Sequence, residues 1–364
     1  METQTVRASQ GSLSAPDRDK PLLSVRDLKT YYFQDEGTVR AVDGATFEVH
    51  VGRTLGVVGE SGCGKSVTAK SILRLVEKNG QIVEGAIVYH RAMATGQEVD
   101  LDLTTLDAKG PEIRSIRGGE IALIFQEPMT SFSPVHTIGA QIVEAIRLHQ
   151  EVSAKEAHTL AMDALHRVGI PLPKQRMEAY RHQLSGGLRQ RAMIAMALSC
   201  DPRLLIADEP TTSVDVTTQA QILDLLRSLQ RESGMAIMYI THNLGVVAEL
   251  ADDVVVMYLG RVVEKASVDQ LFHAPRHPYT IALLRSIPGI HSEPKERLPT
   301  ISGSVPHPYE RPVGCPFHPR CEHRIRGVCD QKPPRLTRIS EDQEVSCYLY
   351  QGETEDGESV VVAQ

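Results

Sequence analysis

The chain has 364 residues, of which 41% are hydrophobic and 23% charged, and its formal net charge is −7. These values are ordinary for a soluble globular protein of about two domains. The acidic balance excludes a global basic field that would attract nucleic acid or anionic lipid. The sequence has no apolar run long enough to span a bilayer, and its start lacks the apolar core of a signal peptide, so we expect a cytoplasmic protein.

The first part of the chain predicts a disordered tail over residues 1–21 and then strands. Strand-like segments follow at 22–28, 39–50 and 54–59. A helix is predicted next from the helical spacing of four apolar residues: Ala69, Ile72, Leu73 and Val76. The chain thus changes from strand to helix directly after a glycine-rich loop.

Residues 135–198 are predicted to be mostly helical, with the clearest amphipathic stretch at 151–170. Strand character returns at 203–208 and 236–241, with a helical segment between them. Strands that alternate with helices predict an α/β fold, in which a mainly parallel sheet is covered on both faces. The helical block, about residues 131–199, is therefore an insertion between the two halves of this sheet.

After about Phe272 the composition changes to segments rich in Pro, His and Cys. We interpret residues 273–351 as a separate small extension, and residues 352–364 as an acidic tail. Two cysteines, Cys63 and Cys200, stand alone, whereas the other four are clustered in this extension. In a reducing compartment such a cluster suggests a metal more than disulfides.

The segment GESGCGKS, from Gly59 to Ser66, matches the phosphate-loop pattern G-x-x-x-x-G-K followed by Ser or Thr, and it lies between a predicted strand and a predicted helix. Its backbone N–H groups would wrap phosphates, Lys65 would reach the β- and γ-phosphates, and the Ser66 hydroxyl would bind Mg²⁺. A simple glycine turn is the plainer alternative. The residues expected to contact nucleotide are Gly59, Glu60, Ser61, Gly62, Cys63, Gly64, Lys65, Ser66 and Val67.

Polar side chains end three predicted strands of the same sheet. LLIADEP places Asp208 and Glu209 after a buried strand, where Asp208 would hold Mg²⁺ through water and Glu209 would act as general base. Gln126 ends IALIFQ and would touch metal and water, and His242 ends YITH and would donate to the γ-phosphate. Taken singly, each of these residues is more often a satisfied polar group or a helix cap, so their weight comes from sharing one sheet edge.

A second anion site is predicted at LSGGLRQR, where Ser185, Gly186 and Gly187 precede a helix. Five features, in the order phosphate loop, Gln126, LSGG, Asp208–Glu209 and His242, resemble the ATP-binding subunits of ABC transporters over about residues 22–272. In that family two ATPase subunits meet head to tail, so each ATP lies between the phosphate loop of one subunit and the LSGG helix of the other. The resemblance implies a P-loop NTPase fold of the ABC ATPase type with an N-terminal antiparallel β part, and it implies an active ATPase.

Further roles come from the same resemblance. Ser185, Gly186 and Gly187 would contact the γ-phosphate of the partner's ATP, and Asp215 in TTSVDV matches the loop that crosses between subunits. The Ser and Val that precede Asp215 are a mild departure from the family pattern. An aromatic residue from LKTYYF would stack on adenine, and we favour Tyr32 over its two neighbours.

Longer segments, among them FQEPMTSFSPV, QLSGGLRQRAMIAMAL and HAPRHPYTIALLRSIP, resemble the ATPases of oligopeptide and dipeptide importers. The resemblance implies a second ATPase, expected to be a paralogue, two permeases that bind this subunit at the cytoplasmic face of the plasma membrane, and an extracytoplasmic solute-binding protein. No nucleic-acid partner is expected. Nickel and oligosaccharide importers belong to the same subfamily and remain alternatives, as does a soluble ABC ATPase without a transport role.

The cysteine spacing is C-x5-C-x7-C-x17-C, for Cys315, Cys321, Cys329 and Cys347. It lacks the short C-x₂₋₄-C knuckle of zinc modules, although four thiolates suit either a tetrahedral metal or an iron–sulfur cluster. Relatives with this tail resemble proteins that hold a 4Fe-4S cluster, which is our expectation here. Zinc and no metal at all remain the alternatives. His318 and His323 could substitute as ligands, and plain surface histidines are the simpler interpretation of these two.

Overall fold

The computed structural model describes residues 20–92, 97–126, 132–212, 214–287 and 301–351 of the chain. The predicted acidic tail 352–364 and most of the predicted N-terminal tail lie outside the described residues. Pro21, which the sequence predicted to lie in that tail, is instead the first residue of a strand. No helix in the described part of the chain combines the length and the apolar character needed to cross a membrane.

The first sheet is antiparallel and lies at the N-terminal end of the chain. Its four strands pair in the order β2-β1-β4-β5. Their bounds are Pro21–Gln34 for β1, Gly37–His50 for β2, Gly80–Ala92 for β4 and Glu98–Asp102 for β5. This sheet is the antiparallel part that the resemblance implied.

The second sheet has eight strands in the order β11-β12-β10-β9-β3-β8-β7-β6. The pairs from β9 to β6 are parallel, and those among β9, β10, β12 and β11 are antiparallel. The bounds are Thr54–Val58 for β3, Ile121–Ile124 for β6, Leu204–Asp208 for β7, Ala236–Thr241 for β8, Asp253–Tyr258 for β9, Arg261–Ser267 for β10, Thr337–Ser340 for β11 and Gln343–Val345 for β12.

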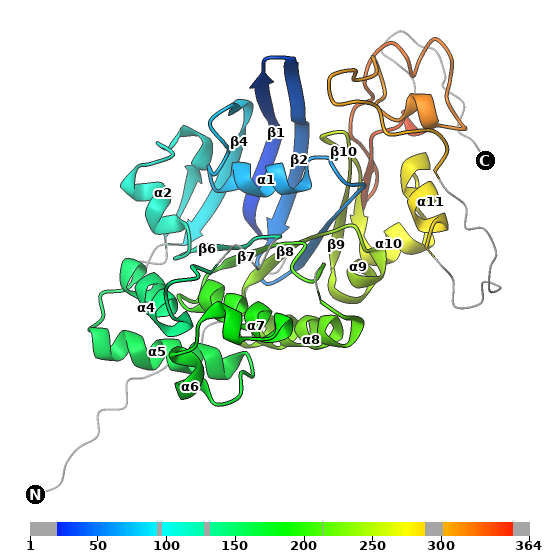
Figure 1. The fold of residues 1–364 in the computed structure, drawn as a ribbon. Coiled ribbons are helices and arrows are strands. Elements are labelled where there is room, and N and C mark those ends of the chain that lie inside the picture. The colour runs from blue at the N-terminus through cyan, green and yellow to red at the C-terminus, as the bar shows by residue number, and fades with distance from the viewer. Residues whose placement is uncertain (1–19, 93–96, 127–131, 213, 288–300, 352–364) are drawn as a thin grey trace, which may run out of the picture.

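The central parallel strands are buried along almost their whole length because both faces of the sheet are covered. In β7, Leu204 and Ile206 pack with the antiparallel sheet, whereas Leu205 and Ala207 pack with the helical block. This alternation follows the two-residue period of a strand. Figure 1 shows α1 (Lys65–Ile72) and the antiparallel sheet on one side of the main sheet, and the helices from α4 (Ile138–His149) to α8 (Val216–Ser233) on the other.

Most of the described helices begin at a residue whose side chain caps them. In α5, for example, Ser153 and Glu156 form a reciprocal capping box at the start of the predicted amphipathic stretch. The helices are α1 Lys65–Ile72, α2 Pro111–Ile116, α4 Ile138–His149, α5 Ala154–Arg167, α6 Pro173–Met177, α7 Gly186–Leu198, α8 Val216–Ser233, α9 Leu244–Leu250, α10 Val268–His273 and α11 Pro278–Arg285. Helices α4–α7 lie between β6 and β7 in the chain, as the predicted insertion requires.

The C-terminal part differs from the expected separate extension. Strand β12 pairs with β10 and so lengthens the main sheet, with Glu264 opposite Val345. Tyr279 and Phe317 pack in one apolar cluster with Tyr258 of β9. The C-terminal part is therefore built onto the ATPase core, because its short strands and aromatic side chains complete an edge of the core that would otherwise face water.

Candidate nucleotide-binding site

The predicted phosphate loop joins the end of β3 to the start of α1, and its glycines are required by close backbone contacts. Gly59 and Gly64 have φ angles of 153° and 102°. A Cβ at Gly59 would lie 2.2 Å from the carbonyl oxygen of Met257, and one at Gly64 would lie 2.3 Å from that of Ala41. A larger residue at either position would displace the backbone, so the loop can take this shape only with glycine there.

Lys65 is the first residue of α1, and its side chain is buried against the loop. Its Nζ donates to the carbonyl oxygens of Gly59 at 2.8 Å and Glu60 at 3.2 Å. The ammonium group is thus held at the centre of the loop by neutral acceptors. An incoming phosphate, which is charged, would be a stronger acceptor for it.

Ser66 and Asp208 lie together although they are far apart in the sequence. The Ser66 hydroxyl donates to Oδ1 of Asp208 at 3.0 Å. Burial raises the pKa of the Asp208 carboxyl, and the hydrogen bond from Ser66 opposes this effect. Mg²⁺ prefers oxygen ligands, and here a hydroxyl oxygen and a carboxylate oxygen lie next to each other. These two residues therefore fit that ion.

Two of the predicted strand-end residues meet at the carboxylate of a third, Glu209. Gln126 Nε2 donates to Oε2 at 3.2 Å, and His242 Nδ1 lies 3.2 Å from Oε1. Thr212, which the sequence analysis did not single out, donates to Oε2 at 3.1 Å. Glu209 has a φ of 46°, a left-handed conformation that is uncommon for a non-glycine residue and often marks a functional site. The contacts with Gln126, Thr212 and His242 together fix the orientation of the Glu209 side chain.

One cavity joins the phosphate loop to Gln126 and Glu209. Its loop lining consists of Ser61, Gly62, Gly64, Lys65, Ser66 and Val67, whereas Asp208 and His242 are not among its lining residues. Three residues of the C-terminal part, His307, Pro308 and Arg311, line it as well. These three residues could not be predicted from the sequence, because they lie in no motif and in a segment without periodicity.

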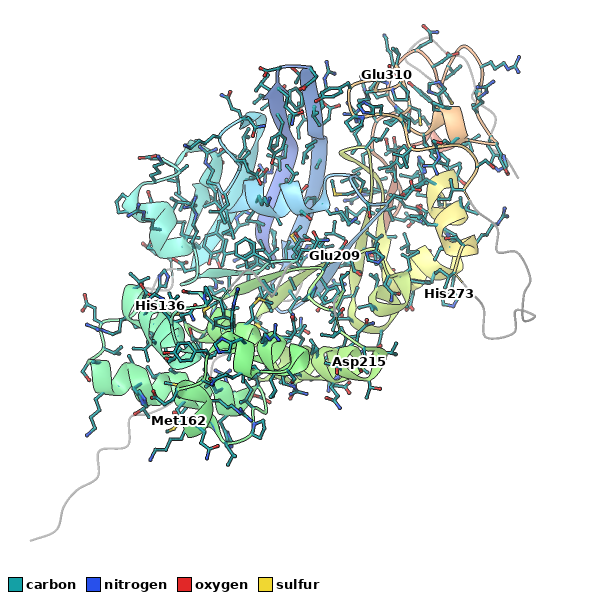
Figure 2. All side chains as sticks on the ribbon, in the orientation of Figure 1. His136, Met162, Glu209, Asp215, His273 and Glu310 are labelled. Atoms are coloured by element: carbon teal, nitrogen blue, oxygen red, sulfur yellow. The ribbon has the colours of Figure 1, made fainter. Side chains whose placement is uncertain are left out.

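The other predicted nucleotide contacts do not line this cavity. Ser185 caps α7 at its exposed start, and Asp215 caps α8 by accepting from Thr218 N at 2.9 Å. Figure 2 shows Glu209 at the edge of the main sheet and Asp215 in the layer of helices on the far side. Tyr32 is also outside the lining, since its hydroxyl donates to Glu77. These residues could join the site only through a second subunit or a bound adenine.

Cys63 is buried within the phosphate loop, and burial raises the pKa of its thiol. Such a thiol is protonated at neutral pH and packs as a small apolar group. Its place in the loop therefore does not indicate a reactive nucleophile.

The four clustered cysteines line one small cavity, which is also lined by His318 and His323. All four are free thiols, and burial raises the pKa of Cys315 to about 11 and that of Cys347 to about 12. Within the described residues, no group of three His, Cys, Asp or Glu side chains is arranged to hold a single metal ion. The thiols thus surround a common space without meeting at one point.

Comparison with known proteins identifies the family. The family model "ABC transporter" matches residues 42–212, and "Oligopeptide/dipeptide transporter, C-terminal region" matches residues 263–329. "Probable peptide ABC transporter ATP-binding protein y4tR" of Sinorhizobium fredii is 50% identical over 90% of this chain and 94% of its own length. The chain belongs to the ATP-binding proteins of ABC transporters. It is therefore an ABC ATPase with a site suited to ATP and Mg²⁺.

Two further comparisons agree with this assignment. "Oligopeptide transport ATP-binding protein AppD" of Bacillus subtilis is 48% identical over 91% of this chain and 98% of its own length. The dimeric structure of MJ0796, a bacterial ABC transporter cassette, matches with a TM-score of 0.58 at 24% identity over 68% of this chain and 98% of that one. The latter likeness supports the fold alone.

Proposed function

We propose that this ABC ATPase powers the import of peptides, of the oligopeptide or dipeptide type. The observation that carries the proposal is the likeness to peptide-transport ATP-binding proteins, which extends over about nine-tenths of the chain and so includes both the ATPase core and the C-terminal part. The expected partners are a second ATPase, two permeases and an extracytoplasmic solute-binding protein. The subunit would then bind the cytoplasmic face of the membrane through the permeases.

The proposed hydrolysis uses groups that already lie together. Lys65 exchanges the carbonyl oxygens of Gly59 and Glu60 for the phosphates of ATP. Ser66, Asp208 and Gln126 would hold Mg²⁺, whose charge offsets that of the phosphates. Glu209 takes the proton of the attacking water, while His242 holds its carboxylate from one side and would also donate to the γ-phosphate.

The exposed residues complete the site of a second subunit in this proposal. Ser185, Gly186 and Gly187 offer free N–H groups at the positive end of α7, which suits the γ-phosphate of a partner's ATP. Asp215 would lie at the crossing between subunits, and Tyr32 would stack on adenine after leaving Glu77. The ATPase domain proposed here spans residues 22–272, with the helical subdomain, about residues 131–199, as the surface nearest the permeases.

We further propose that the four thiols hold an iron–sulfur cluster of the 4Fe-4S type. Four cysteines around one space suit a cluster, whose irons are bound separately, better than one ion bound by all four. Protein purified without oxygen should contain iron and acid-labile sulfide and should be brown. A colourless, iron-free protein would contradict the cluster, and stoichiometric zinc would support the alternative ion.

The decisive test of the transport role is affinity purification of the tagged chain from detergent-solubilised native membranes. Recovery of two multi-span permeases and a second ATPase is expected, followed by ATP-dependent peptide uptake after reconstitution with the binding protein. Uptake of nickel or an oligosaccharide instead would contradict the peptide assignment. Recovery only from the soluble fraction, with nucleic acid or cluster-assembly proteins, would contradict the transport role altogether.

A further inference from the structure

A buried ion pair connects the C-terminal part to the phosphate loop. Arg320 Nη1 lies 2.7 Å from Oε2 of Glu60, and Nη2 donates to Oε1 at 3.1 Å. The pair is bidentate, which is the strongest arrangement of guanidinium and carboxylate. Only 4% of the Arg320 side chain is exposed, against 26% for Glu60, so little water competes for the contact.

The remaining donors of Arg320 hold the guanidinium in place. Nε donates to the carbonyl oxygen of Ser302 at 3.1 Å, and Nη1 also donates to the Tyr258 hydroxyl at 3.3 Å. The guanidinium carbon lies 5.8 Å from the centroid of the Tyr258 ring. Arg320 is therefore held in place by the C-terminal part and β9, and its guanidinium cannot freely follow a displacement of Glu60.

Glu60 is also fixed through its backbone. Its N–H donates to the Tyr279 hydroxyl at 2.9 Å, and its carbonyl oxygen accepts from Lys65 Nζ. Glu60 thus lies between two residues of the C-terminal part and the lysine that would bind phosphate. A shift of Glu60 would therefore act directly on Lys65, whose Nζ is bonded to the Glu60 carbonyl oxygen.

Charge gives the ion pair a second consequence. The Glu60 carboxylate belongs to the loop that would wrap the phosphates of ATP, and an unpaired negative charge there would repel them. Arg320 offsets this charge and also turns the carboxylate toward the C-terminal part. The same contact therefore sets the shape of the loop and its electrostatic potential.

We propose that Arg320 is a positioning residue for the phosphate loop, acting through Glu60, so that the C-terminal part of the chain sets the affinity of the site for ATP. The proposal rests on the nucleotide site described above. A purely structural pair would stabilise the fold without changing nucleotide affinity, and this difference can be measured.

The test compares purified full-length Arg320→Gln, Glu60→Gln and the double variant, using a fluorescent trinitrophenyl derivative of ATP and steady-state hydrolysis. Arg320→Gln should raise the Kd and the KM for ATP about fivefold or more, with a smaller change in kcat. The double variant should bind no more weakly than Arg320→Gln alone, because the charge that Arg320 offsets is gone. The exposed Arg326 provides the matched control, and Arg326→Gln should bind ATP like the wild type.

Three outcomes would overturn the proposal: an unchanged Kd in Arg320→Gln, additive losses in the double variant, or an equal loss in Arg326→Gln. If Arg320→Gln does not fold, Arg320→Lys replaces it, since lysine keeps the charge but loses the bidentate fork, and its Kd should still rise. Lys65→Ala distinguishes a failure of the nucleotide site from a failure of the proposed role of Arg320. Normal binding and turnover in that variant would contradict the nucleotide site itself, whereas an effect there without one in Arg320→Gln would contradict only the role of Arg320.

Discussion

Two regions of this chain are predicted to act on ATP, and they are built differently. Around Glu209, side chains from two other strand ends and a following turn converge on its carboxylate beside the phosphate loop. At Ser185–Gly187, the start of the helix is exposed. There the Ser185 hydroxyl accepts a hydrogen bond from Leu188 N and so caps its own helix. The first region is assembled within one chain, whereas the second, in the proposed dimer, would offer its backbone donors to the ATP of a partner subunit. This difference is what a site shared between two subunits requires.

The largest effect is expected at the assembled region. Glu209→Gln should lower ATP turnover about a hundredfold or more, because the amide cannot accept the proton of the attacking water. The variant should still bind ATP, which equilibrium binding of a labelled nucleotide would show. Glu151→Gln, at an exposed position, is the control. Turnover close to that of the wild type would remove Glu209 from the role of general base.

His242→Ala should cost less, on the order of tenfold in kcat, because Gln126 and Thr212 still hold the other oxygen of Glu209. Steady-state kinetics of this variant beside Glu209→Gln would rank the two residues. A larger loss in His242→Ala than in Glu209→Gln would mean that the imidazole, not the carboxylate, carries the main chemical role.

The exposed region should respond differently. A Cβ at Gly186 would meet nothing within 4 Å, so Gly186→Arg should leave the fold and the affinity of one chain for nucleotide unchanged. Its bulk should block ATP-dependent association of ATPase subunits, as light scattering or gel filtration with ATP would detect. Association like that of the wild type, at equal nucleotide affinity, would contradict a shared site at the LSGG helix.

The smallest effect is expected at Asp215, which has a structural role within the chain as well as the proposed one between chains. Asp215→Ala removes the cap of α8 and should lower the free energy of unfolding slightly. Asp215→Asn keeps a capping oxygen and should recover most of that stability, which chemical denaturation would measure. If Asp215→Asn restores stability but not ATP-dependent association, the residue acts between subunits as proposed.

Much of the nucleotide region followed from local sequence. The phosphate-loop pattern between strand and helix, and the buried strand that ends at Asp208, were both placed correctly because their signals lie within a few residues of each other. The meeting of Gln126 and His242 at Glu209 followed from one rule, namely that parallel strands end at the same edge of a sheet. The hydrogen bond of the Tyr32 hydroxyl did not follow, since its partner Glu77 lies in the loop between α1 and β4.

By itself, the sequence determined the motifs, the alternation of strand and helix, and the family, since each depends on residue types at short spacing. Only the tertiary structure decided that the C-terminal part joins the main sheet, lines the nucleotide cavity and pairs Arg320 with Glu60. That ion pair joins residues 260 positions apart. No periodicity or motif links such distant positions, because their contact depends on how all the elements between them pack.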